Sequence, residues 1–234
     1  MSYSSFNAGP WEYLSVPCEL SPHFVYGFFT KRGPDLKDPK DASFFLEVFS
    51  LKRFVVMNQE HSDRINIIKN GENPQTGDAL VVLERNVAAL VKSADCCPIV
   101  LMDPKHEIAA VIHAGYKGTL KRIAEKTVKV MEDLGSEPKD LYAVVGPSIG
   151  RCCYNVGDEV FSLFLNEFGY KDYFSFFGGR IYLDLRKLNI FLLSRVGVSK
   201  IEVIDLCTFC NSDTFYSHRR GDKDKRQISF VIIK

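Results

Sequence analysis

Three side chains of this sequence, His61, Cys96 and His113, carry the donor atoms that bind borderline and soft metal ions. Each of them follows or closes a short run of apolar, often β-branched residues, which predicts a strand. The three runs are Phe54–Asn58, Ala88–Lys92 and Ile108–His113. Ligands in open α/β sheets gather at the carboxyl ends of strands, so this placement can bring the three side chains together.

Two imidazoles and one thiolate are the donor set of a catalytic zinc site. Three protein ligands leave the fourth tetrahedral position open for water or substrate. The ion would keep Cys96 as a thiolate and lower the pKa of its bound water toward about 7. The sequence contains no HExxH motif, and a lone histidine or cysteine after a strand is more often structural, so only the set of three carries this hypothesis.

The segment after the third ligand, HAGYKG (His113–Gly118), predicts a strand end, a glycine turn and the start of a helix. Gly115 and Gly118 allow the backbone to approach a ligand closely. The free N–H groups of the helix and the charge of Lys117 would attract an anion, such as a phosphate or a carboxylate. The alternative is that the two glycines only turn the chain, and the spacing does not decide between them.

The chain around these residues alternates between strands and helices. Short apolar runs bounded by turn residues predict strands at Phe24–Thr30, Phe54–Asn58, Ala79–Leu83, Ala88–Lys92, Pro98–Met102, Ile108–His113, Leu141–Val145, Ile181–Leu183, Ile201–Leu206 and Ile228–Ile233. The spacing of apolar side chains predicts helices at Ala42–Phe49, Thr119–Leu134, Gly157–Phe168 and Arg186–Val196. The polar stretch Ser217–Arg226 predicts a loop. This order favours a mixed-sheet α/β or α+β fold.

The composition excludes several classes of protein. The 234 residues are 46% hydrophobic and carry 30 basic against 29 acidic side chains. A formal net charge of +1 gives no electrostatic footprint for nucleic acid or an anionic membrane. No apolar run approaches the roughly 20 residues of a membrane span, and the start of the chain does not resemble a secretory signal. We therefore expect a single cytoplasmic domain over residues 1–234, with 1–24 as an extension of uncertain order.

The seven cysteines do not have the spacing of a disulfide framework. An odd number in a chain without a secretory signal indicates free thiols in a reducing compartment. For Cys152 and Cys153 we favour buried structural thiols over side chains that line a site. The pair Cys207 and Cys210 lacks the second CxxC of a zinc ribbon. We expect at most one or two of the seven to do chemistry.

Six sequence blocks resemble, in order, the motifs of the YfiH-type family, which is also named polyphenol oxidase, multicopper laccase domain and purine nucleoside phosphorylase. The blocks are NQEHSDRI (Asn58–Ile65), GDALVV (Gly77–Val82), SADCCPIVLMD (Ser93–Asp103), HAGYKG (His113–Gly118), GPSIGRCCYNVGDEV (Gly146–Val160) and CTFC…FYSHRRGDKDKRQISF (Cys207–Phe230). The resemblance implies a layered α/β/β/α sandwich. It also implies one zinc ion held by His61, Cys96 and His113, which would then be the catalytic residues.

The resemblance further implies phosphorolysis of adenosine, inosine, guanosine and methylthioadenosine to free base and ribose 1-phosphate, together with adenosine deamination. The candidate phosphate ligands are Lys117, Arg219 and Arg220. Lys117 adds a positive charge at the helix N-terminus, and the guanidinium groups of the two arginines match phosphate oxygens. The alternative for the two arginines is a solvated loop. Tyr116 or Tyr154 could stack on the purine, or both could be ordinary core aromatics.

Three residues depart from the family motifs. Ser62 stands where glycine follows the first ligand, Tyr116 replaces tryptophan, and Lys117 replaces arginine. Lysine keeps the charge but gives up the two-pronged hydrogen bonding of arginine, which can weaken phosphate binding and shift substrate preference. None of these departures removes a predicted ligand.

Two acidic residues flank the predicted ligands. Asp95 could orient His113 through a hydrogen bond, or it could cap the turn after its strand. Glu60 precedes His61, whereas zinc deaminases use a glutamate in an H-x-E context, so we interpret Glu60 as incidental.

The sequence leaves three other functions open. A copper-dependent polyphenol oxidase would use copper in place of zinc, but the chain has only five histidines, and His23 and His106 match no ligand motif. A Cys96–His113 hydrolase would need no metal. A closed zinc module would bind a partner protein and catalyse nothing. The sequence does not decide between a monomer and a dimer.

Overall fold

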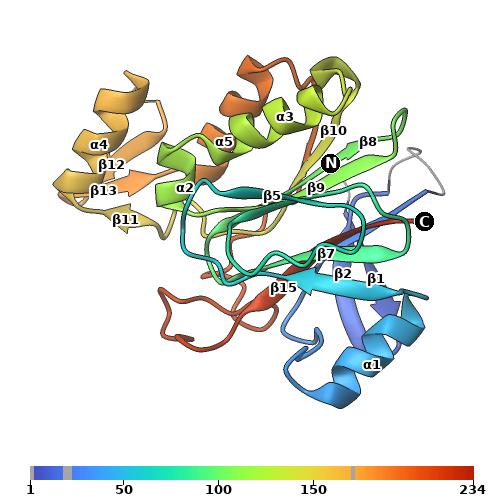
Figure 1. Cartoon of the computed structure of the whole chain (residues 1–234). Helices are drawn as coiled ribbons and strands as arrows, with labels where there is room; N and C mark the ends of the chain where they lie inside the picture. Colours follow the sequence, from blue (N-terminus) through green and yellow to red (C-terminus); the bar gives the residue numbers. More distant parts are fainter. Residues whose placement is uncertain (1–2, 18–22, 170–171) are drawn as a thin grey trace.

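Two six-stranded sheets lie face to face in the computed structural model, which describes residues 3–17, 23–169 and 172–234 (Figure 1). In spatial order the first sheet contains β1 (Ser4–Ala8), β2 (Trp11–Ser15), β3 (Phe24–Phe29), β15 (Gln227–Ile233), β7 (Val87–Ser93) and β4 (Arg53–Val56). The second contains β14 (Lys200–Val203), β10 (Tyr142–Val145), β8 (Cys97–Asp103), β9 (Ile108–Ala114), β6 (Ala79–Val82) and β5 (Ile65–Ile68). A small third sheet contains β11 (Asn155–Val156), β13 (Arg180–Leu183) and β12 (Phe174–Phe177).

The helices of the described residues are α1 (Pro39–Val48), α2 (Tyr116–Leu120), α3 (Ile123–Asp133), α4 (Asp158–Phe168), α5 (Leu185–Arg195) and a 3-10 helix at Pro138–Asp140. Helices cover the outer faces of the two large sheets, and α4 lies beside the small third sheet. Side chains of α3 and α5 share a buried cluster with the second sheet, and Phe45 of α1 shares another with the first sheet. The layers therefore run helix, sheet, sheet, helix, which confirms the predicted α/β/β/α sandwich (Figure 1).

Burial on both faces explains why the central strands are continuous apolar runs. Every residue of β9 is buried, and successive side chains alternate between the two sides of the sheet. Ile108, Ala110 and Ile112 belong to the cluster shared with the helices. Ala109 and Val111 belong to the cluster between the two sheets. The same row on the inner side leads to His113, the last ligand candidate.

All strands predicted from the sequence overlap an observed strand, and Ser217–Arg226 contains no helix or strand, as expected. The predicted helix Thr119–Leu134 is wrong in one respect, because it is divided into α2 and α3. Arg122 has a left-handed backbone with φ of 62°, and this interrupts the helix. Its guanidinium donates to Glu125 and Glu167, which secures the new start of α3.

The N-terminal residues form part of the first sheet. β1 and β2 pair as an antiparallel hairpin, and β2 pairs with β3 at the edge of the sheet. Trp11 is 5% exposed and packs against the rings of Phe29 and Phe45. Within the expected extension over 1–24, Ser4–Ala8 and Trp11–Ser15 thus form strands of the first sheet, while residues 1, 2 and 18–22 lie outside the described residues.

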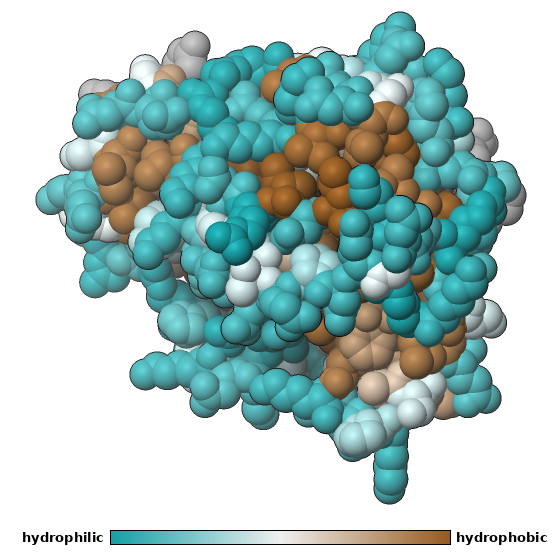
Figure 2. Space-filling view, in the orientation of Figure 1, coloured by the Kyte–Doolittle hydropathy of each residue, from teal (hydrophilic) through white to brown (hydrophobic). Residues whose placement is uncertain are grey.

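The surface is mainly polar on the face drawn in Figure 2, with apolar patches between the polar side chains. One patch lies over α4 and the third sheet, whose exposed side chains include Leu163, Phe176 and Phe177. Among the helices of the described residues, none has both the length and the apolar character needed to cross a membrane.

Trp11 provides a direct test of the N-terminal hairpin, because it is the only tryptophan of the chain. Its fluorescence should be that of a buried indole and should change in the same denaturant transition as the far-ultraviolet circular dichroism. An earlier, separate fluorescence transition would show that the hairpin is not part of the cooperative sheet.

Candidate metal centre and adjoining cleft

The sheet topology brings the three ligand candidates to one end of the sandwich. β4 and β7 are parallel neighbours, so the loops that follow them, with His61 and Cys96, leave the first sheet on the same side. The turn with Cys96 leads directly into β8, whose first residue, Cys97, pairs with Ala114 at the end of β9. His113, in β9, therefore lies beside Cys96, in the turn before β8.

The three ligand atoms converge. All of them lie within 4.8 Å of one another, Cys96 Sγ is 3.8 Å from His61 Nε2, and the two imidazole centroids are 4.9 Å apart. Tetrahedral zinc with bonds of about 2.3 Å to sulfur and about 2.0 Å to nitrogen would place these atoms about 3.5 Å apart. His113 is buried, Cys96 is half-buried and His61 is exposed, so the site opens toward solvent on the His61 side.

Asp78, directly before β6, holds two of the three ligand candidates in place. Its fully buried carboxylate lies 2.8 Å from His113 Nδ1 and accepts hydrogen bonds from the backbone N–H groups of Glu60, His61 and Ser62. The Ser62 hydroxyl donates to it as well, at 2.6 Å. Burial raises the pKa of this carboxyl, but the hydrogen bonds from His113 and Ser62 outweigh burial and hold the pKa far below its usual value. A carboxylate only accepts, so His113 Nδ1 carries a proton and Nε2 is left for a metal ion.

The loop with His61 is held in an unusual backbone conformation. His61 has a φ of 56°, in the left-handed region that is uncommon for residues other than glycine, and the bonds to Asp78 fix it there. On the other side, the amide of Gln59 bonds both the N–H and the C=O of Lys92 in β7, each at 2.7 Å. The loop is thus tied to both sheets.

The charges of Cys96 and His113 stabilise each other. Burial raises the pKa of the Cys96 thiol, but the charge of His113 and hydrogen bonds with both imidazoles outweigh burial and lower it to about 6. Burial lowers the pKa of His113, but the Cys96 thiolate and Asp78 outweigh burial and raise it to about 9. Without a metal, a thiolate–imidazolium pair is therefore the dominant form between about pH 6 and 9.

Gly115 leaves room for the ligands. A Cβ atom at this position would lie 2.9 Å from Cys96 Sγ and 3.0 Å from His61 Cδ2. Its φ of −70° is ordinary for any residue, so the space and not the backbone requires glycine. A cradle of two imidazole nitrogens and one thiolate, with no side chain between them, fits the donor preferences of zinc.

A cleft of about 600 Å³ adjoins the three ligand candidates. Its walls come from the His61 loop, the turn before β8, the start of α2 and the loops before β11 and β15. The lining residues are Asn58, Gln59, His61, Lys92, Ala94, Asp95, Cys96, His113, Tyr116, Tyr154, His218, Arg219, Lys223, Asp224 and Arg226. The volume is in the range of small-molecule sites.

Asp95 does not orient His113, and that suggestion from the sequence is wrong because Asp78 occupies the position. Asp95 instead accepts hydrogen bonds from the Thr208 and Ser217 hydroxyls and from the backbone N–H of Arg219. Asp95 also has a φ of 90°, which is uncommon for a residue other than glycine. Asp95 thus fixes the connection between β14 and β15 next to Cys96.

Of the three predicted phosphate ligands, only Arg219 lines the cleft. Arg219 lines the cleft, lies over the ring of Tyr154 and donates to Asn155. Arg220 does not line the cleft, because its guanidinium donates to three backbone carbonyls of its own loop and to Asp222. Lys117 is exposed, lies over the ring of Tyr116, and is also outside the lining.

Sequence reasoning did not identify Asp78 and Gln59, although both lie in recognised blocks. Asp78 precedes a fully buried strand, and an acid at that point is a signal for a buried hydrogen-bonded carboxylate. The pairing of Gln59 with Lys92 has no such signal, because it depends on the parallel alignment of β4 and β7.

A two-sheet sandwich with three potential metal ligands gathered at one end defines the class of this protein. Residues 41–234 match the sequence model of the multi-copper polyphenol oxidoreductase laccase family, and the chain belongs to this family. Purine nucleoside phosphorylase YlmD of Bacillus subtilis is 33% identical over 221 residues, which cover 83% of this chain and 77% of that protein.

Other relatives differ in length or in name. Purine nucleoside phosphorylase LACC1 of Mus musculus is 32% identical over 80% of this chain, but the chain spans only 45% of the length of that protein. Adenosine deaminase RL5, of an unknown prokaryotic organism, is 36% identical over 61% of this chain and 56% of its own length. The crystal structure of the hypothetical protein YfiH of Bacillus licheniformis superposes with a TM-score of 0.85 at 28% identity, covering 98% of this chain and 99% of that one.

Asp78→Asn should lower the affinity for zinc about ten- to a hundredfold, because the amide cannot accept from His113 Nδ1 and from the loop as a carboxylate does. A competition titration with a chromogenic chelator measures this. The matched control is Asp103→Asn: Asp103 is equally buried and bonds His106 Nδ1 at 2.8 Å, at the opposite end of the β8–β9 hairpin. Equal affinity losses in the two variants would contradict the role of Asp78.

Cys96 in metal-free protein should react with iodoacetamide half-maximally near pH 6, well below the usual thiol value of about 8.5. The lowered pKa means that the thiolate persists as the pH falls from 8 to 6 and is lost only below that. His113→Gln removes the facing charge and should move the midpoint upward. A midpoint above pH 8 in the unaltered protein would contradict the thiolate–imidazolium pair.

Proposed function

We propose that this chain is a zinc-dependent purine nucleoside phosphorylase, with the ion held by His61, Cys96 and His113. It would convert adenosine, inosine, guanosine or methylthioadenosine and phosphate to the free base and ribose 1-phosphate. One observation supports this most: three converging ligand atoms open onto a cleft of about 600 Å³ that carries both aromatic and basic side chains. Two relatives are named purine nucleoside phosphorylase, which supports purine nucleosides as the substrate class.

The cleft carries both aromatic and basic side chains. Tyr116 and Tyr154 offer aromatic faces on which a purine could stack. Arg219 carries its guanidinium next to Tyr154 and would bind the phosphate. When bound, the zinc ion supplies a Lewis acid beside the cleft. The chain's own part is to hold base and phosphate on neighbouring walls, so that the phosphate faces the ribose as its bond to the base breaks.

The basic loop before β15 replaces the predicted helix N-terminus as the proposed phosphate site. His218, Arg219, Lys223 and Arg226 all line the cleft from this loop. Arg220 has the supporting role, because its bonds fold the loop that presents Arg219. Lys117 would act only at the rim, beside Tyr116.

The histidines favour zinc over a copper cluster. All five lie among the described residues, and only His61 and His113 lie in the ligand cluster. His106 pairs with Asp103, and His23 lies 3.8 Å from Glu107. A multicopper centre needs many more imidazoles in one place, so laccase chemistry finds no support in these side chains.

Adenosine deamination is the second candidate, supported by the relative named adenosine deaminase RL5. Zinc deaminases transfer protons through a glutamate beside the metal. Glu60 is exposed and does not line the cleft, and the carboxylate of Asp95 is already occupied by three donors. Asp224 is the other acidic residue of the described lining. Because no glutamate lines the described cleft, we favour phosphorolysis over deamination.

The test is base release from inosine and adenosine, followed by chromatography with and without phosphate in zinc-loaded protein. We expect hypoxanthine and adenine only with phosphate, and no activity in Cys96→Ala. Inosine formed from adenosine without phosphate would assign deamination instead. Absence of both products would contradict the proposal.

Arg219→Ala should raise the KM for phosphate about tenfold or more and change the KM for nucleoside little, since one charged hydrogen-bonding group is lost. Lys129→Ala, on the exposed face of α3, is the matched loss of one charge and should change neither value. A larger effect of Lys117→Ala than of Arg219→Ala would move the phosphate site to α2.

A further inference from the structure

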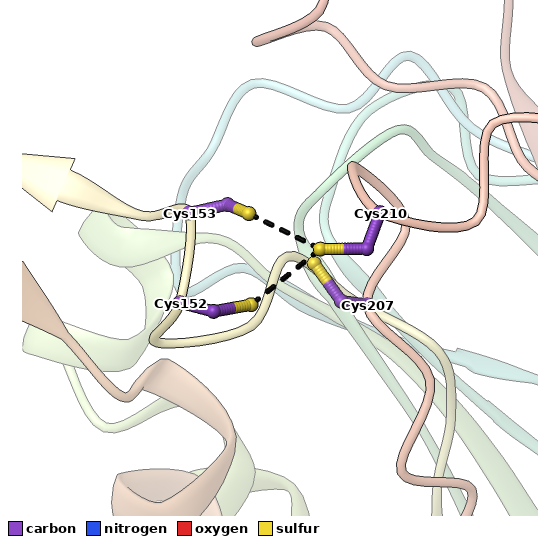
Figure 3. A group of neighbouring side chains, drawn as sticks. All are labelled: Cys152, Cys153, Cys207 and Cys210. Atoms are coloured by element: carbon purple, nitrogen blue, oxygen red, sulfur yellow. Dashed lines mark hydrogen bonds between the residues drawn. The ribbon is translucent and has the colours of Figure 1, made fainter.

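A second group of potential metal ligands lies outside the cleft. Cys152 and Cys153 stand in the turn between β10 and β11, and Cys207 and Cys210 stand in the loop after β14. Cys152 is exposed and Cys153 is half-buried, so the interpretation of this pair as buried thiols is wrong. The reason is that the turn lies at the surface, facing the loop of the CTFC motif (Figure 3).

The four sulfur atoms have the arrangement of a metal site. All lie within 4.8 Å of one another, and Cys210 Sγ is 3.7 Å from Cys152 Sγ and 3.3 Å from Cys153 Sγ. Figure 3 shows the side chains of the two loops pointing toward one another. Four sulfurs bound tetrahedrally to zinc at about 2.3 Å would be about 3.8 Å apart, whereas a disulfide requires about 2.05 Å. The group is therefore closer to a tetrahedron than to two bonded pairs.

The backbone supports this arrangement. Gly150 N–H donates to Cys207 Sγ at 3.2 Å, which stabilises negative charge on that sulfur. A Cβ atom on Gly150 would lie 3.2 Å from Cys152 Sγ and 3.3 Å from Cys207 Cβ, so the glycine leaves space for the cluster. The two loops are also joined by the bridge between Ser148 and Cys207.

We propose that Cys152, Cys153, Cys207 and Cys210 bind one zinc ion as a structural tetrathiolate site, separate from the His61–Cys96–His113 centre. Each thiol releases its proton to solvent as its sulfur binds the ion, and no electron is transferred. Four protein ligands leave no open position, so the site is closed and holds no substrate. Iron is the other ion that fits four sulfurs, and the metal analysis below distinguishes the two.

The site would fix one wall of the cleft. Tyr154, which lines the cleft, follows Cys153 directly. Thr208, next to Cys207, donates to Asp95, and Arg220 donates to the carbonyls of Thr208 and Phe209 inside the CTFC motif. A metal that joins the two loops would therefore hold both the tyrosine and the arginine loop in place.

The test uses two reciprocal variants of the full chain, purified anaerobically without added metal. We expect about two zinc ions per unaltered chain and about one in each variant, Cys96→Ala and the double variant Cys152→Ser/Cys210→Ser. In Cys96→Ala, X-ray absorption at the zinc edge should show four sulfur ligands at about 2.3 Å. The matched control is Cys97→Ala, which removes a buried cysteine outside both groups and should keep both ions.

The unaltered protein keeps the proposal falsifiable if the double variant does not fold. Titration with a mercurial reagent should release a second zinc ion together with the loss of these four thiols. Zinc bound through nitrogen or oxygen in Cys96→Ala, no metal there, or iron in place of zinc would overturn the proposal. So would a disulfide between the two loops in the freshly isolated protein. None of these results depends on nucleoside turnover, so they leave the proposed function to its own test.

Discussion

The site at the end of the sandwich depends on one buried carboxylate. Asp78 accepts hydrogen bonds from the loop of His61 and from the ring of His113, although these two proposed ligands come from different sheets. An ionised carboxylate without water is costly, and here the cost is offset by five donors. The result is a fixed orientation of one imidazole and a fixed, unusual backbone at the other. Ser62, at the position where the family has glycine, adds the hydroxyl donor and does not disturb this network.

Asp95 is a second carboxylate that holds a loop in place by hydrogen bonds. Asp78 positions His61 and His113, whereas Asp95 positions the basic loop that lines the cleft. Asp95 lies beside Cys96 and accepts hydrogen bonds from Thr208, Ser217 and Arg219 in the long connection between β14 and β15. β15 pairs with β7 in antiparallel register, so the loop before β15 reaches the same end of the sandwich as the turn after β7. The loops that follow β4 and β7 therefore form one side of the cleft, and the basic loop before β15 forms another.

Much of this could be predicted from the sequence. Apolar runs gave the central strands because both faces of these sheets are buried, and the motif blocks gave the layered fold and the three converging residues. The hairpin of residues 4–15 could not be predicted, since its strands lie at a sheet edge and alternate weakly. The break at Arg122 was equally hidden, because the apolar spacing continues across it. The four-cysteine group could not be predicted, because Cys152 and Cys207 are far apart in the sequence and are brought together only by the fold.

The different positions of Arg219 and Arg220 could not be predicted from the spacing of residues in the sequence. Both are consecutive cations in one recognised block, yet one lines the cleft and the other is used by carbonyls of its own loop. Backbone direction within an irregular loop decides this, and no periodic pattern records it.

The most direct test of the central claim is anomalous X-ray diffraction from crystals, measured on both sides of the zinc absorption edge. We predict a zinc peak bonded to His61 Nε2, Cys96 Sγ and His113 Nε2, with its remaining coordination position directed into the cleft. Crystals of zinc-loaded protein with no peak at these three atoms, or with a fourth protein ligand closing the site, would contradict the account.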